Sequence, residues 1–132
     1  MKGNIIMNDQ NKTCEERISG HLEGRAEDFR AAMAAKDLEN VSEDVGNFYD
    51  YGLDFSYVEP NTFGDQKTGY YRYQLSWGGP SDEIRFYQDG KIEYSFMDWY
   101  DGAVKEITNL DWAQWVKDYF AESIDWDAVE IY

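Results

Sequence analysis

The amino-acid sequence predicts an α+β fold with an N-terminal helix, an antiparallel sheet of four to five strands and a C-terminal helix. Apolar residues recur at helical spacing after residue 13 and again after residue 109, and between these stretches apolar and polar residues alternate. Such alternation is typical of an antiparallel sheet with one buried face. A chain of 132 residues is long enough to bury one substantial core. We therefore expect a disordered N-terminus over 1–12 and a single α+β domain over 13–132.

The first helix is expected over residues 14–38. Thr13 and Glu16 match the capping box, in which the side chain of each residue accepts a hydrogen bond from the backbone N–H of the other. Four apolar residues follow at helical spacing, with acidic residues on the opposite side, as in an amphipathic helix that packs on a core. These four residues are Ile18, Leu22, Phe29 and Met33.

Two strands are expected in "LDFSYVE" (53–59) and "YYRYQLSW" (70–77). In each, every second residue is apolar and should face the interior, while Arg72, Gln74 and Ser76 should lie on the polar face. The expected inward-facing residues are Leu53, Phe55 and Tyr57 in the first strand and Tyr71, Tyr73, Leu75 and Trp77 in the second.

The next hairpin has an Asp-Gly pair at its corner, a strong turn pattern that ends at Gly90. A two-residue turn would mix apolar and polar side chains on both faces. A three-residue loop instead pairs Phe86 with Ile92 and keeps Arg85 and Glu93 together on the polar face. Because the buried face sets the register, we expect the three-residue loop, with Gly90 in the left-handed conformation within a bulge.

The glycine pair in "WGGPSDE" (77–83) has two interpretations, a hairpin corner or a loop that cradles a phosphate. A phosphate-binding loop needs a helix N-terminus to supply N–H groups and a favourable dipole. Here strand-like alternation continues on both sides, and Pro80 lacks an N–H group. We therefore expect a hairpin corner.

After Trp99 we expect a turn, a fifth short strand and a final helix in "LDWAQWVKDYFAES" (110–123). Thr108 or Asn109 is the expected helix cap, and the apolar face should include Trp112 and Val116. The tail over 124–132 either extends this helix or folds back as a strand.

Composition and charge limit the classes of function. The chain has five Trp, eleven Tyr and seven Phe, and its formal net charge is −15. The aromatic content indicates a folded chain, and the negative charge argues against direct binding to nucleic acid or to an anionic membrane. Cys14 is the only cysteine, so no intrachain disulfide or multi-cysteine zinc site is expected. With no signal-peptide core and no run of about 20 apolar residues, we expect a cytoplasmic protein.

Catalytic and metal-binding constellations are weak in this sequence. Cys14 and His21 lie two helical turns apart, about 10 Å, which is too far for a nucleophile and its base. Adjacent acidic residues such as Asp82 and Glu83 are expected by chance among 27 acids, and "DWYDG" lacks the ligand order of a calcium loop. We therefore expect no enzyme activity, no cofactor and no metal site.

The distribution of acidic residues is the strongest functional feature. Asp111, Asp118, Glu122 and Asp125 are spaced to form one stripe on the expected last helix, at intervals of about 10, 6 and 4.5 Å. These intervals are comparable to the phosphate spacing of DNA. The segment 37–66 contains eight acids and no base. The predicted partner-binding residues are the stripe together with Glu43, Asp44, Asp50 and Asp54, and the outward-facing Trp99.

Small, acidic, aromatic-rich α+β proteins of this size resemble phage- and plasmid-encoded inhibitors of host defence, of the anti-CRISPR or antirestriction type. The block "YYRYQLSWGGPSDEIRFYQDGKIEYSFMDWYDGA" (70–103) resembles a core found in uncharacterised mobile-element proteins. The resemblance implies that the chain inhibits a nucleic-acid-processing complex by occupying its DNA- or RNA-binding surface.

The functional hypothesis is therefore a non-enzymatic inhibitor of a bacterial defence complex, CRISPR or restriction machinery, with a basic nucleic-acid-binding protein as partner. Its acidic side chains would replace phosphates as a DNA mimic. The alternative is an immunity protein or antitoxin that neutralises one basic toxin. A small enzyme that uses buried carboxylates, and a domain whose acidity serves solubility alone, also remain open.

Overall fold

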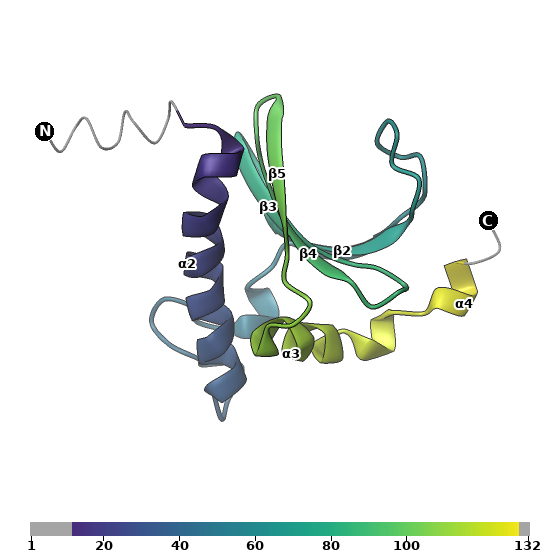
Figure 1. Ribbon diagram of the computed structural model, residues 1–132. Coiled ribbons are helices and arrows are strands. Elements are labelled where there is room, and N and C mark those ends of the chain that lie inside the picture. Colours follow the sequence, from purple (N-terminus) through teal and green to yellow (C-terminus); the bar gives the residue numbers. More distant parts are fainter. Residues whose placement is uncertain (1–11, 130–132) are drawn as a thin grey trace, which may run out of the picture.

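A computed structural model of the chain describes residues 12–129. Five strands form one antiparallel sheet in chain order, and Figure 1 shows this sheet curling with α2 and α3 on its convex side. The predicted α+β class is confirmed, whereas the expected disordered segment 1–12 lies outside the described residues except for Lys12. The elements are α2 (Cys14–Ala34), η1 (Phe48–Asp50), β1 (Asp54–Val58), β2 (Tyr70–Ser76), β3 (Pro80–Phe86), β4 (Ile92–Asp98), β5 (Asp101–Glu106), α3 (Asp111–Tyr119), η2 (Ala121–Ser123) and α4 (Trp126–Val129).

Helix α2 begins at the predicted capping box. The Thr13 hydroxyl accepts a hydrogen bond from the Glu16 N–H, and the Glu16 carboxylate accepts one from the Thr13 N–H. The helix ends at Ala34, four residues before the expected end, because Ala35 has extended backbone with a ψ of 144°. The Asp37 carboxylate then accepts a hydrogen bond from the N–H of residue 39 and forms a turn. Met33, expected to face the core, is 39% exposed near this end.

The β3–β4 hairpin has the predicted register. Phe86 pairs with Ile92 and Arg85 with Glu93. The Tyr87 N–H donates a hydrogen bond to the Lys91 carbonyl, which leaves a three-residue loop over 88–90. Gly90 has a φ of +97°, so a side chain at this position would be strained. The glycine pair at 78–79 joins β2 to β3, as expected for a hairpin corner.

A β-bulge in β2 reverses the alternation that the sequence predicts. Pairing passes from Gln74–Glu83 directly to Ser76–Asp82, so Leu75 is an extra residue in this strand. Beyond the bulge each residue faces the opposite side, and the Ser76 hydroxyl therefore donates a hydrogen bond to Asp82 on the helix side of the sheet. The expected inward position of Trp77 is wrong, because this side chain is 76% exposed.

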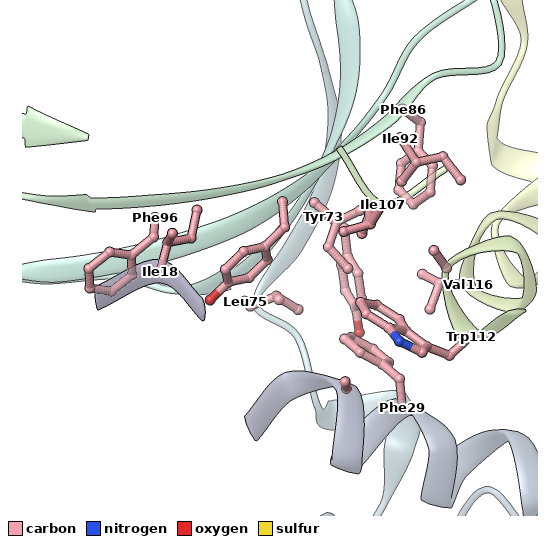
Figure 2. Close-up of a cluster of buried hydrophobic side chains, with 14 of the residues drawn as sticks. Ile18, Phe29, Tyr73, Leu75, Phe86, Ile92, Phe96, Ile107, Trp112 and Val116 are labelled. Atoms are coloured by element: carbon pink, nitrogen blue, oxygen red, sulfur yellow. The ribbon is translucent and has the colours of Figure 1, made fainter. Parts of the chain in front are cut away.

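The core lies between the convex face of the sheet and the two helices. Figure 2 shows Phe29 of α2 and Trp112 of α3 beneath the sheet residues Tyr73 and Ile92. The rings of Phe29 and Trp112 stack with their centroids 5.1 Å apart. Leu53, expected inward, precedes β1 and is 61% exposed. Within residues 12–129, no helix is long and apolar enough to cross a membrane.

The C-terminal part differs most from the expectation. Helix α3 starts after Leu110, which makes no side-chain capping bond, so neither Thr108 nor Asn109 is the cap. The helix ends at Tyr119, because Phe120 leaves the helical path and stacks on Phe55 at 4.0 Å. Residues 121–123 of the expected helix form the separate short helix η2, and the described part of the tail, 124–129, neither extends α3 nor forms a strand but contains the short helix α4.

Candidate functional site

Two acidic segments that are far apart in the sequence lie side by side in the fold. The segment that contains η1 packs on α3 through aromatic contacts, with Phe48 against Trp115 at 5.3 Å and against Tyr119 at 5.1 Å. Tyr49 lies beside Tyr119, with ring centroids 6.3 Å apart. The segments that carry Asp50 and Asp54 therefore lie next to the end of α3.

The four residues predicted to form one helical stripe do not share one helix. Asp111 and Asp118 lie on α3, Glu122 lies on η2, and Asp125 lies between η2 and α4. The axial intervals calculated for a continuous helix therefore hold only for Asp111 and Asp118. Asp125 is held in place by Tyr71, whose hydroxyl donates to the Asp125 carbonyl and accepts from its N–H, both at 3.1 Å.

The other predicted acidic residues lie on the segment before the sheet. Asp50 belongs to η1 and Asp54 starts β1, both next to the end of α3. Glu43 and Asp44 lie in the preceding loop, and Asp44 lines a cavity against α2, so this pair is placed apart from the α3 carboxylates. All eight predicted acidic residues are exposed, and none forms an ion pair within residues 12–129. We refer to Asp50, Asp54, Asp111, Asp118, Glu122 and Asp125 as the acidic surface.

None of the arginines forms an ion pair with the acidic surface within residues 12–129, and four of the five pair with carboxylates elsewhere. Arg25 binds Asp82 and Arg85 binds Glu83, and both of these carboxylates are buried. A buried carboxylate needs a partner far more than an exposed one does, since desolvation penalises its charge. Arg25 and Arg85 therefore stabilise buried carboxylates and are not available to the acidic surface.

Trp99 lies away from the acidic surface, at the β4–β5 corner. Its neighbours Asp98 and Asp101 bind Arg17 and the Cys14 N–H, both at 2.7 Å, in the first turns of α2. Helix α3 instead packs against the second half of α2, so the two regions are about 20 Å apart along its axis. Trp99 is 84% exposed and has a φ of +58°, which is unusual for a bulky residue.

The two adjacent carboxylates singled out in the sequence, Asp82 and Glu83, point to opposite faces of β3. Asp82 faces α2, where both its oxygens bind Arg25, at 2.7 and 3.0 Å, and Tyr94 donates to it at 2.6 Å. Burial raises the pKa of Asp82, but the charge and hydrogen bonds of Arg25 outweigh this effect, and the pKa is lowered. A glycosidase acid needs a raised pKa and a second carboxylate across a cleft, so this pair does not fit that chemistry.

The structure also shows the surroundings of His21 and Cys14, the other reactive groups considered from the sequence. His21 stacks on Phe96, with ring centroids 4.2 Å apart. Cys14 is buried, and burial together with the nearby Asp101 raises the pKa of its thiol, which makes it a poor nucleophile. No group of three or more metal-ligating residues occurs within residues 12–129.

A cavity on the concave face of the sheet was not predicted from the sequence. Neither α2 nor α3 packs on this face (Figure 1), yet Tyr70 and Glu83 are each only 2% exposed there. The cavity has a volume of about 350 Å³ and is lined by aromatic residues together with Arg72, Glu83 and Arg85. The alternation of apolar and polar residues predicts Arg72 on the polar face of the sheet. No sequence pattern indicates that residues of loop 59–69 and Trp77 enclose a cavity on this face.

Comparison with protein-family models, with curated proteins and with solved structures finds no match to this chain. A function is therefore inferred from the charge, burial and contacts of its own residues.

Proposed function

We propose that this protein is a non-enzymatic inhibitor of a nucleic-acid-binding bacterial defence complex, of the CRISPR or restriction type. Its acidic surface occupies the basic groove that normally holds phosphates. The observation that supports the proposal is a set of exposed carboxylates on the adjoining segments of η1, β1 and the end of α3, none of which forms an ion pair within residues 12–129.

Unpaired surface carboxylates suit this role for a physical reason. A carboxylate already paired with arginine would have to break that pair before it could bind a partner's lysine or arginine. The acidic surface needs no such exchange, and the net charge of −15 attracts a basic groove from a distance. The attraction should weaken with salt, because screening acts over about 8 Å at physiological ionic strength.

The aromatic contacts give this surface a fixed shape. Phe120 follows α3 and joins its end to the sheet, since its ring stacks on Phe55 of β1 and contacts Tyr73 of β2 with a centroid distance of 4.6 Å. A pre-organised surface loses less conformational entropy on binding than a mobile acidic tail does. The core packing of the aromatic residues and the position of the carboxylates are therefore linked.

The test is affinity capture from bacterial lysate, with the bound proteins identified by mass spectrometry. One variant neutralises Asp111, Asp118, Glu122 and Asp125 by Asp→Asn and Glu→Gln substitution. A control variant of equal charge change neutralises Glu15, Glu27, Asp89 and Glu106, which are exposed elsewhere. We expect the native chain and the control to capture a nucleic-acid-binding complex that added DNA displaces, and the first variant to lose it.

Two outcomes would contradict this proposal. Equal capture by both variants would show that the acidic surface has no special role. A single captured partner that DNA does not displace would favour the immunity protein or antitoxin instead. Circular dichroism of each variant checks that the fold is retained.

A further inference from the structure

The cavity on the concave face contains Arg72, which forms no ion pair within the part of the chain that the structure describes. Arg72 lies on β2 directly opposite Arg85 of β3, and like charges at directly opposed positions destabilise a sheet. Arg85 is neutralised by Glu83, at 2.8 Å. Arg72 takes part in no ion pair within residues 12–129, and its Nε atom is buried without a hydrogen-bond partner. In a chain with more than twice as many acids as bases, this arrangement indicates a site for an anion.

The charge of the lining limits which anion fits. Arg72, Arg85 and Glu83 together carry one net positive charge. A carboxylate, with a single negative charge, balances this lining and matches the planar fork of a guanidinium group with two parallel hydrogen bonds. A phosphate dianion would leave excess negative charge beside the buried Glu83. The lining therefore favours a carboxylate.

The rest of the cavity favours an aromatic group. Four rings line it: Phe63 from a loop, Tyr70 from β2, Trp77 from the β2–β3 corner and Tyr87 from the residue after β3, while Met97 adds a thioether. Aromatic rings and thioether sulfur atoms both make favourable contacts with a bound ring. The volume of about 350 Å³ is at the small end of the range for ligand sites.

We propose that this cavity binds a small aromatic carboxylate, with the carboxylate on the Arg72 guanidinium and the ring among Tyr70, Trp77 and Met97. Burial and the hydrogen bond to Glu93 raise the pKa of Tyr87 to about 12, so this residue stays neutral and does not repel the anion. None of the residues of the acidic surface lines the cavity, so the site is independent of the proposed inhibitory surface.

The experiment is isothermal titration calorimetry of the native chain with three probes of similar shape. Phenylacetate has both a ring and a charge, phenylacetamide lacks the charge, and cyclohexylacetate lacks the aromatic ring. We expect the native chain to bind phenylacetate about ten- to a hundredfold more tightly than phenylacetamide, as a charge-assisted hydrogen-bonded pair would give. Cyclohexylacetate should bind more weakly than phenylacetate.

Substitution then assigns the binding to the cavity. Arg72→Met should remove the preference for phenylacetate over phenylacetamide. Arg30→Met, which makes the same charge change at an exposed arginine on α2, should retain the preference. Trp77→Ala changes an exposed rim residue without emptying the core, and should weaken the binding of phenylacetate and phenylacetamide alike.

The proposal is overturned if phenylacetate does not bind the native chain, or if Arg72→Met binds it as tightly as the native chain does. Should Arg72→Met fail to fold, the Trp77→Ala variant decides the matter. Unchanged binding of phenylacetate by that variant would place the ligand outside this cavity.

Discussion

Replacing Asp82 with asparagine removes the carboxylate that joins β3 to α2. Asp82 is 5% exposed, and its two oxygens accept hydrogen bonds from Arg25, Ser76 and Tyr94. An asparagine side chain retains one acceptor oxygen and presents an N–H₂ group to the remaining donors. The Arg25 guanidinium would then lie against the sheet without a counter-charge.

The expected cost of Asp82→Asn is about 3 kcal/mol of unfolding free energy. Breaking a buried ion pair on one side costs about 3–5 kcal/mol, because the remaining charge is uncompensated. The side chain of Arg25 is 22% exposed, so water can solvate part of it, and the lower end of this range applies. The exposed Arg30–Glu23 pair provides a control for the buried pair. Glu23→Gln should cost under about 1 kcal/mol of unfolding free energy, because an exposed ion pair contributes little.

The assay is urea denaturation at neutral pH, followed by circular dichroism. It compares the native chain, the single variants Asp82→Asn, Arg25→Met and Glu23→Gln, and the double variant Asp82→Asn with Arg25→Met. The combined variant should cost less than the sum of its parts, because it leaves no uncompensated charge. A cost for Asp82→Asn no larger than that for Glu23→Gln would refute the reasoning. So would strict additivity with Arg25→Met.

The pH dependence gives an independent check of the same pair. Because the pKa of Asp82 is lower in the folded chain, its contribution is complete at a pH above its ordinary value of about 4. The contribution is lost as the pH falls through the lower folded value. The stability difference between the native chain and Asp82→Asn should therefore narrow below about pH 4. The ion-pair explanation would be contradicted if the stability difference between the native chain and Asp82→Asn stayed constant down to pH 2.

Two further predictions concern glycines and tryptophans, each measured by urea denaturation. Gly20→Ala should stabilise the chain by about 0.5–1 kcal/mol, because Gly20 lies in α2 with open space around it. Gly90→Ala should destabilise the chain by about 1–2 kcal/mol, since the φ of Gly90 is positive. Equal effects would contradict the backbone argument. Trp112→Ala should cost about 3–5 kcal/mol through loss of its stack on Phe29, whereas Trp99→Ala, at an exposed corner, should change stability by less than about 0.5 kcal/mol. A large cost at Trp99 would indicate that this residue has a packing role.

The candidate site was predictable in part. Sequence reasoning selected residues that are all exposed, and the structure brings Asp50 and Asp54 next to the end of α3. It placed Glu122 and Asp125 on one helix with Asp111, which is wrong because Phe120 stacks on Phe55 and ends the helical path. That stacking joins residues 65 positions apart, and no local pattern could have predicted it.

By itself, the sequence determined the features that depend on neighbours along the chain: the capping box at Thr13, the alternation that predicts an antiparallel sheet of four to five strands, and the three-residue hairpin loop before Ile92. These follow from backbone hydrogen bonding and from the need to keep apolar residues on one face. Only the tertiary structure decided the bulge at Leu75, the position of Trp77 and the allocation of arginines to buried carboxylates. These depend on which distant groups meet in the interior, where an unpaired charge or donor is too costly to leave.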